Sequence, residues 1–307
     1  MSSMQHIIFM KGMSFMNNAL IVGGDMRNVC LAREFKKRGS APLVCGIDAE
    51  KLGDAGSLCD DFARSVSGAS LIILPLPVTK DGVRLHTPLW QGELFVADVL
   101  RYARKDALIC GGKMNCDLFS EHALTAVDYA ARDDFASLNA VPTAEGAIEA
   151  VMKLLPVTIF SSSALVTGFG KTAKVLALTL KAMGANVTVC ARSVRDRSLA
   201  EAFGLKAVHL DEMHLYLPRA DIVFNTIAHR VFFARELDAI REHTPFADIA
   251  SAPGGADADE AKARGINYLF LPGLPGKYSP VTAAQIIFKT ITNIGKEANL
   301  WNLGEKE

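Results

Sequence analysis

The sequence has no excess of charge of either sign, because 33 basic side chains balance 33 acidic ones. Binding of nucleic acid or of an anionic membrane surface usually needs a basic excess, so this balance supports neither partner. No apolar run approaches the roughly 20 residues that span a bilayer, and the N-terminal segment lacks the apolar core of a signal peptide. We therefore expect a cytoplasmic protein that acts on a small molecule.

The sequence also lacks the common catalytic and metal-binding patterns. It contains no Ser–His–Asp elbow, no P-loop and no zinc-ligand spacing, which argues against a hydrolase, a kinase or a metalloenzyme. Its six cysteines form no CxxC pair. Several of them lie in apolar, strand-like runs, and a chain of this length rarely needs a disulfide framework. We expect six buried free thiols in a reducing cytosol.

What the sequence does contain is an alternation of short apolar strands and amphipathic helices. The strands are apolar throughout, which is typical of parallel sheets that helices cover on both faces. The pattern predicts an α/β protein of two domains, each a parallel-sheet, Rossmann-like layer fold, with a cleft between them. The predicted segments are an N-terminal extension over 1–17, a substrate-side α/β domain over 18–140, a bridging helix over 141–156, an NAD(P)-binding Rossmann domain over 157–297 and a tail over 298–307.

Two helices connect the predicted domains. Thr143 is the expected N-cap of the bridging helix, and Pro156 is expected to end it. The final helix, from about Val281 to Ala298, is expected to return and pack on the first domain.

The stretch "GFGKTA" is the strongest motif. Gly168, Gly170 and Ala173 form the G-x-G-x-x-A variant of the dinucleotide fingerprint, and Lys171 begins the helix that follows. The first glycine allows a tight turn, the second lets the backbone approach a pyrophosphate, and the small third residue allows close packing of helix and strand. We predict that a nicotinamide coenzyme binds here, with a merely structural turn as the alternative.

The next strand ends in arginine rather than in the acid that usually binds the ribose of NAD. "TVCARSVRDRS" places Arg192 and Ser193 at that point. A guanidinium can pair bidentately with a 2′-phosphate, which an acid would repel. The sequence therefore favours NADPH over NADH. Arg195 and Arg197 either add positive field or are solvated loop charges.

Later strand ends supply further candidates for the coenzyme site. Asn225 and Thr226 end a strand beside the expected nicotinamide ribose, and Ser251 lies in "DIASAPGG". "LPGLPGKYSPVTAA" is rich in glycine and proline, and within it Lys277 and Tyr278 are the candidates for handling a proton or an anion. The alternative is a loop that only turns the chain into the last helix.

The substrate-side domain offers donors for a carboxylate. Arg27 in "GGDMR" is a candidate clamp, although it is also explained as an exposed residue at a helix start. Thr79, Lys113 and Asn115 follow the third and fourth strands, where ligands bind in open α/β sheets. We expect His86 to be structural or solvated.

Taken in order, these stretches resemble the A subunit of dipicolinate synthase from endospore-forming bacteria. The resemblance covers about residues 18–297 and rests on "GGDMR", "LPLPVTKDG", "NAVPTAEGAI", "GFGKTA", "GANVTVCAR", "NTI", "DIASAPGG" and "PGLPGKYSPVTAAQI". Two features depart from the family pattern. Residues 1–17 look additional, and the pair His229–Arg230 is not typical of the family, so we assign it no catalytic role.

The resemblance implies oxidation of a dihydrodipicolinate-type ring to pyridine-2,6-dicarboxylate, with NAD(P)⁺ as hydride acceptor. It also implies that a flavoprotein-like B subunit is the partner and that the protein works in the mother-cell cytoplasm during sporulation. Aromatisation favours the chemical step, so orienting the ring and holding two carboxylates would be the protein's main tasks. Two alternatives stay open: another NADP-dependent dehydrogenase of shikimate or hydroxyacid type, and a non-catalytic NADPH-sensing subunit. The oligomeric state also stays open, a homo-oligomer included.

Overall fold

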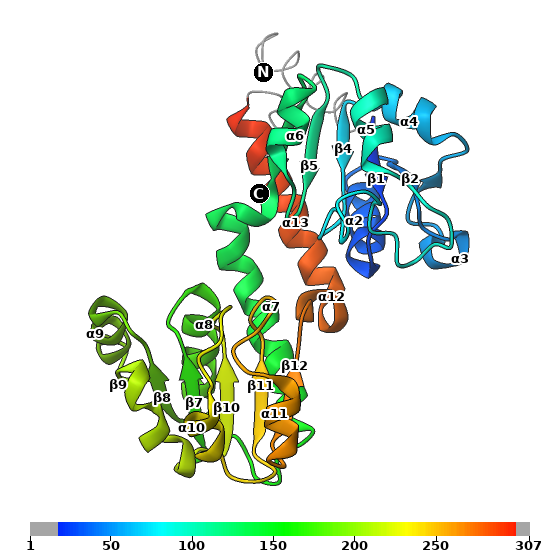
Figure 1. Ribbon diagram of the computed structural model, residues 1–307. Coiled ribbons are helices and arrows are strands. Elements are labelled where there is room, and N and C mark those ends of the chain that lie inside the picture. The colour runs from blue at the N-terminus through cyan, green and yellow to red at the C-terminus, as the bar shows by residue number, and fades with distance from the viewer. Residues whose placement is uncertain (1–17, 299–307) are drawn as a thin grey trace. The chain divides into compact units, whose positions relative to one another are not determined.

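The computed structural model describes residues 18–298. The expected extension over 1–17 lies outside the described residues, as does the tail from residue 299 onward. The chain divides into two compact units (Figure 1). The first takes in residues up to Phe135 and from Pro280 onward, and the second is Ala136–Ser279.

The first unit is built on a sheet of six parallel strands. Its strand order is β3-β2-β1-β4-β5-β6. The strands are β1 Ala19–Val22, β2 Leu43–Cys45, β3 Ser57–Leu58, β4 Leu71–Ile73, β5 Leu108–Gly111 and β6 Thr125–Asp128. The helices are α2 Met26–Lys37, α3 Ala49–Leu52, α4 Phe62–Gly68, α5 Val96–Tyr102, α6 Cys116–Glu121, the 3₁₀ turn η1 Tyr129–Ala131 and α13 Pro280–Glu297.

The second unit repeats this plan. Its order is β12-β11-β10-β7-β8-β9, again with all strands parallel. The strands are β7 Ser163–Thr167, β8 Asn186–Cys190, β9 Lys206–Val208, β10 Ile222–Asn225, β11 Pro245–Asp248 and β12 Asn267–Phe270. The helices are α8 Lys171–Ala182, α9 Val194–Ala202, α10 Ala234–Asp238, α11 Ala258–Ala263 and α12 Leu274–Tyr278, with 3₁₀ turns η2 Leu210–Leu215 and η3 Leu217–Arg219. Helix α7, Asp133–Met152, begins in the first unit and continues in the second.

Burial on both faces explains the uniformly apolar strands. In β7, Ala164 and Val166 join one buried cluster, which includes Leu176 of α8, whereas Leu165 joins another cluster on the opposite face. Neighbouring residues of a strand point to opposite faces, so a strand that is covered twice needs apolar residues at every position. The predicted α/β class with two Rossmann-like units is confirmed.

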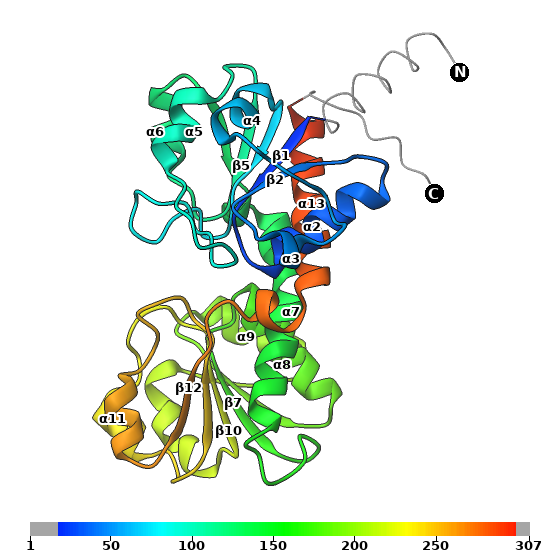
Figure 2. The same cartoon turned by 90° about the vertical axis from the view of Figure 1, so that its right-hand side faces the viewer.

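The last helix belongs to the first unit. Figure 2 shows α13 beside α2. The rings of Phe35 and Phe288 meet edge to face with centroids 5.0 Å apart, and the Arg38 guanidinium lies 4.3 Å from the Phe288 ring centre. This confirms the predicted return of the final helix to the first part of the chain.

The helix predicted over 141–156 differs from the one observed. Helix α7 starts at Asp133, contains Pro142 and ends at Met152. Thr143 is therefore inside the helix, where its hydroxyl donates to the carbonyl of Asn139 over 2.7 Å instead of capping a helix end. The acidic residues of the first turn suit the positive end of the helix dipole and mark the true start.

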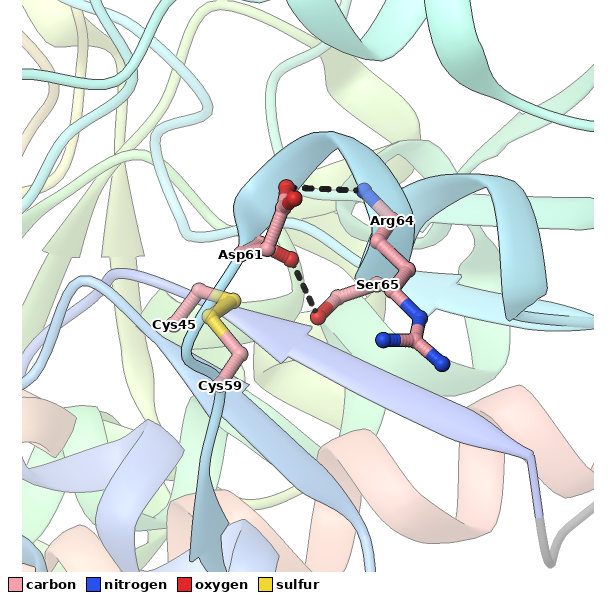
Figure 3. The surroundings of a disulfide bond; sticks show 5 residues. All are labelled: Cys45, Cys59, Asp61, Arg64 and Ser65. Carbon is pink, nitrogen blue, oxygen red and sulfur yellow. Dashed lines mark hydrogen bonds between the residues drawn. A yellow bond between two sulfur atoms is a disulfide. The ribbon is translucent and has the colours of Figure 1, made fainter.

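Two cysteines correct the prediction of free thiols. Cys45 and Cys59 form a disulfide (Figure 3). Strands β2 and β3 pair in parallel, and the Cys59 N–H donates to the carbonyl of Val44, which brings the two Cα atoms to 5.4 Å. Sequence spacing alone does not reveal this register. The other four cysteines are free: Cys30, Cys110 and Cys190 are buried, and Cys116 is half-buried.

Two properties of residues 18–298 bear on the predicted class of protein. None of the helices in this range has the length and apolarity that crossing a membrane requires. Within the same range, no group of three or more histidine, cysteine or acidic side chains is placed to hold a metal ion.

Candidate functional site

The turn after β7 has the backbone geometry that the glycine motif predicts. Gly168 adopts φ +83°, and a Cβ at this position would lie 2.7 Å from Oγ1 of Thr226. Gly170 has nothing within 4 Å of an added Cβ. Ala173 is 1% exposed and packs in the core beneath the turn. The first and third positions therefore serve the fold, whereas the open face at Gly170 lets a ligand approach the backbone.

Helix α8 presents an uncapped N-terminus beside this turn. Gly170 is its N-cap and has no side chain to accept from the first amides. The first residue, Lys171, is exposed, and Lys174 lies with Nζ 5.7 Å from the ring centre of Phe169. A helix start without a side-chain cap, the helix dipole and nearby lysines together make a suitable place for a pyrophosphate.

The first unit has the same strand order but a closed helix start. Asp25 caps α2 by accepting from the Arg27 amide over 3.0 Å, and its carboxylate also pairs with Nε and Nη2 of Arg27. A carboxylate already occupies the position that a phosphate would take. This difference supports the interpretation of "GGDMR" as something other than a second nucleotide site.

Arg192 stands exposed at the end of β8. Its Nη2 lies 3.1 Å from Nε2 of His229. Arg197 is not a free loop charge, since its Nη1 donates to the carbonyls of Ala191 and Arg192 and so fixes the backbone there. Ser193 caps α9 by accepting from the amide of Asp196 over 3.3 Å.

Asn225 supports the site from within the fold. Its side chain is fully buried, accepts from the Thr167 hydroxyl over 2.6 Å and donates to Asp248 over 2.8 Å. Thr226 donates its hydroxyl to the carbonyl of Thr167. The side chains of Asn225 and Thr226, both predicted to bind the coenzyme, thus bond to the end of β7, and Asn225 also bonds to the end of β11.

Asp248 is a buried carboxylate that the sequence did not single out. It accepts from four donors: the Asn225 amide, the backbone N–H groups of Ala250 and Gly255, and the Tyr268 hydroxyl. Burial and the neighbouring Asp248 charge raise the pKa of Tyr268, which keeps this hydroxyl a donor. These bonds hold the loop that carries Ser251, whose side chain is exposed.

Lys277 and Tyr278 lie in the short helix α12. Tyr278 packs against the core of the second unit, where a Cβ on Gly146 of α7 would lie 3.1 Å from its ring. Lys153 of α7 places Nζ 5.5 Å from the ring centre of Tyr278. Lys277 is exposed. The two predicted residues therefore have different surroundings, with the lysine free to reach a ligand.

Arg27 is largely committed to its own loop. Besides the two bonds to Asp25, its Nη2 donates to the carbonyl of Leu76 over 2.7 Å. Burial lowers the pKa of Arg27, but the bonds and charge of Asp25 outweigh it, so the net shift is upward. Arg27 thus joins the start of α2 to the loop after β4, which contains the cis bond Leu76–Pro77.

The other predicted substrate residues lie at the same edge of the first sheet. Thr79 shapes a turn, since its hydroxyl donates to Asp81 over 3.0 Å and accepts from the amide of Gly82 over 2.9 Å. Lys113 has φ +54°, and its N–H donates to Asp128 over 3.0 Å. Its side chain is exposed, as is that of Asn115, the N-cap of α6. Lys113 shares a positive φ with three other non-glycine residues of the described range, namely Ala123, Ser161 and His243.

His86 also lies at this edge. Its carbonyl accepts from the amide of Gly24, and its N–H donates to the carbonyl of Val78. The ring is half-buried. Burial lowers the pKa of His86, the charges of Lys80 and Arg27 lower it further, and Asp25 opposes them. The backbone bonds fit the expected structural role of His86. The electrostatic effects of Asp25 and Arg27 show that the ring also interacts with this ion pair.

Comparison with known proteins agrees with this geometry. Residues 18–130 match the family described as the N-terminal domain of the A subunit of dipicolinate synthase, and residues 150–252 match Shikimate / quinate 5-dehydrogenase. The A subunit of dipicolinate synthase from Bacillus subtilis (strain 168) is 30% identical over 279 residues, which cover 89% of this chain and 94% of that protein. The chain belongs to the family of dipicolinate synthase A subunits.

Solved structures of this family share the fold along nearly the whole chain. The A chain of dipicolinate synthase from Bacillus subtilis has a TM-score of 0.80 at 30% identity, covering 91% of this chain and 95% of that one. The A subunit of dipicolinate synthase from Bacillus halodurans has a TM-score of 0.81 at 26% identity, covering 91% and 98%. The suspected family is confirmed, and with its dehydrogenase-type second unit this protein is an oxidoreductase.

Within this oxidoreductase the predicted site residues fall into two sets. Gly168, Gly170, Lys171, Arg192 and Thr226 gather at the strand ends around β7. Arg27, Thr79, Lys113 and Asn115 follow β1, β4 and β5, at the corresponding edge of the first sheet. Asp248 was not predicted from the sequence, although an aspartate at the end of an apolar strand was an available signal.

Proposed function

We propose that this protein oxidises a dihydrodipicolinate-type ring to pyridine-2,6-dicarboxylate and transfers the hydride to NADP⁺. In this reaction one ring hydrogen leaves as hydride and one as a proton, so the ring becomes aromatic. The observation that carries the proposal is the turn at Gly168 and Gly170, with its uncapped helix and the exposed Arg192 at the next strand end. These residues fit a dinucleotide with a 2′-phosphate.

The substrate would be held by the polar residues of the first sheet edge. Lys113 and Asn115 are exposed and able to donate to a carboxylate. Arg27 and Thr79 are partly used by their own loops, so we assign them chiefly to shaping this edge. Lys277 is proposed to bind an anionic group or to handle the proton, and Tyr278 to hold α12 in place. Ser251 is proposed to contact the coenzyme.

We further propose that the chain works with a flavoprotein-like B subunit in the mother-cell cytoplasm during sporulation. The relative from Bacillus subtilis is named as one subunit of a synthase, which supports the existence of a partner subunit. Copurification of the two proteins, followed by activity measurements on each alone and on both together, tests this part. Turnover by the pair would also exclude a purely nucleotide-sensing role.

Coenzyme titration tests the proposal most directly. The binding of NADPH and NADH to wild type and to Arg192→Ala should be followed by fluorescence. We expect wild type to prefer NADPH by at least tenfold, which is about 1.4 kcal/mol, and the variant to lose this preference. Equal binding of both coenzymes by wild type would overturn the assignment of NADP. Oxidation of dihydrodipicolinate with each coenzyme then tests the substrate.

A further inference from the structure

The contact between Arg192 and His229 joins two loops that flank the glycine turn at Gly168 and Gly170, which we call the coenzyme turn. Arg192 follows β8, and His229 lies in the loop after β10. Strand β7, which ends in the glycine turn, lies between β8 and β10 in the sheet. The 3.1 Å contact of Nη2 with Nε2 therefore links residues from the two sides of the turn. The sequence pattern assigned His229 no catalytic role.

The chemistry of the pair fixes the direction of the bond. A guanidinium is a donor only, so Nε2 of His229 is the acceptor in this bond. The bond occupies one Nη2 hydrogen of Arg192. The remaining guanidinium donors are left for a bidentate bond to a phosphate.

We propose that His229 is a positioning residue that holds Arg192 for the 2′-phosphate of NADPH and thereby sets the coenzyme preference. This inference rests on the proposed function. An exposed arginine loses rotamer freedom when it binds an anion, and a neighbour that orders the side chain beforehand reduces that loss. The backbone at Arg192 is already fixed by the two bonds from Arg197, so His229 supplies the missing constraint on the side chain.

Nearby charges single out Arg192 as the phosphate ligand. Arg192, Arg230 and Arg235 line one cavity of about 320 Å³. Arg230 pairs with Glu260 over 2.7 Å, and Arg235 pairs with Glu236 over 2.6 Å. Among the ion pairs of the described part of the chain, none uses Arg192. His229 carries no negative charge, so it leaves the positive charge of Arg192 available to an anion.

The experiment compares two substitutions of His229. His229→Leu removes the acceptor at similar size, and His229→Gln keeps a neutral carbonyl that accepts from a guanidinium. Calorimetric titration would use NADPH, NADH and the fragments adenosine 2′,5′-bisphosphate and adenosine 5′-monophosphate. His243→Asn is the matched control, because that histidine is exposed and lies in the loop that precedes β11, at the opposite edge of the sheet.

We expect His229→Leu to weaken NADPH and the bisphosphate by about fivefold, equivalent to about 1 kcal/mol, and to leave NADH and the monophosphate unchanged. His229→Gln should restore most of the loss, and His243→Asn should change nothing. In the Arg192→Ala background, His229→Leu should have no further effect.

The outcomes separate this inference from the proposed function. If Arg192→Ala loses the NADPH preference while His229→Leu keeps it, the role of His229 is wrong and the coenzyme assignment stands. Equal weakening of NADPH and NADH by His229→Leu also overturns the inference, since it indicates a general structural role. If wild type itself has no preference, the coenzyme assignment is wrong and the inference fails with it.

Discussion

The side-chain amide of Asn225 donates to the carboxylate of Asp248 over 2.8 Å and so ties the end of β10 to the end of β11. Both side chains are 0% exposed. Three further donors converge on the same carboxylate, one of them the hydroxyl of Tyr268. The loop of the second unit that carries Ser251 is thus held by a single buried acid.

Removal of this acid should destabilise the second unit strongly. Asp248→Ala removes the buried acceptor that four donors share, and we expect it to lower the free energy of unfolding by about 3 kcal/mol. Urea denaturation followed by circular dichroism measures this loss. Glu201→Gln, an exposed change on α9, is the control and should stay within about 0.5 kcal/mol of wild type. A similar small effect from Asp248→Ala would show that the network contributes little.

The two glycines of the turn after β7, Gly168 and Gly170, should respond differently to alanine. Gly168→Ala combines φ +83° with a 2.7 Å approach to Thr226, so we expect a loss of about 2 kcal/mol in unfolding free energy. Gly170→Ala meets no neighbour within 4 Å and should change stability by less than about 1 kcal/mol. Its methyl group should still weaken NADPH at least tenfold, about 1.4 kcal/mol. Undiminished NADPH binding by Gly170→Ala would remove the pyrophosphate from this turn.

Arg27 and Lys113 should separate stability from substrate binding. Arg27→Ala leaves the partly buried Asp25 carboxylate without its partner, and we expect about 2 kcal/mol of destabilisation. Lys113→Gly suits the φ of +54° and should leave stability equal or slightly higher. It should raise KM for the dicarboxylate about tenfold with little change in kcat. Unchanged KM in Lys113→Gly, with the Lys113→Ala variant agreeing, would exclude this side chain from substrate binding.

Stability in acid should depend on Asp134. Hydrogen bonds from Arg132 hold the pKa of this carboxyl at about 2, below its usual 3.8, and burial opposes this shift. A depressed pKa means that the stabilisation is complete above about pH 4 and is lost as the pH falls toward about 2. With allowance for partial exposure we expect a loss of about 1 kcal/mol.

Urea unfolding at pH 5 and pH 3 measures this dependence. Asp134→Asn should show a smaller decrease than wild type, whereas Asp117→Asn, on the exposed side of α6, should decrease as wild type does. An identical pH dependence in wild type and Asp134→Asn would mean that the Arg132–Asp134 pair does not couple to folding.

Reduction of the disulfide should loosen the first unit. Cys45 and Cys59 are 14 residues apart, and a closed loop of this length stabilises the fold by up to about 3 kcal/mol. We expect four thiols to react in denaturant without reductant and six after reduction. Thermal unfolding with and without dithiothreitol measures the difference, and the double variant Cys45→Ala/Cys59→Ala should be insensitive to reductant. Six reactive thiols without reductant would show that the pair is reduced in solution.

Backbone features were easier to predict from the sequence than the roles of individual side chains. Uniformly apolar strands and glycine spacing depend on local chemistry, so both parallel sheets and the tight turn at Gly168 followed from the chain itself. Asn225 was expected beside a ribose, but whether an amide faces a ligand or a buried aspartate depends on the neighbouring strand. The same dependence on strand pairing hid the bond between Cys45 and Cys59.

Other differences arose where two local rules conflict. Pro142 is typical of a helix start, yet it lies inside α7, whose first turn contains Asp133 and Asp134.

His229 was set aside because it departs from the family pattern, and only the fold brings it to Arg192. A contact between residues 37 apart in the chain leaves no periodic signal in the sequence.

The first unit is interrupted in sequence, since it stops at Phe135 and resumes at Pro280. Its last helix supplies Phe288, which packs on Phe35 of α2. On the ribosome the sheet β1–β6 is therefore translated long before the helix that covers it, while Ala136–Ser279 emerges as one uninterrupted piece. Synthesis runs from the N-terminus, so the first unit lacks α13 until the second unit has been translated. We therefore expect the first unit to complete its fold after the second.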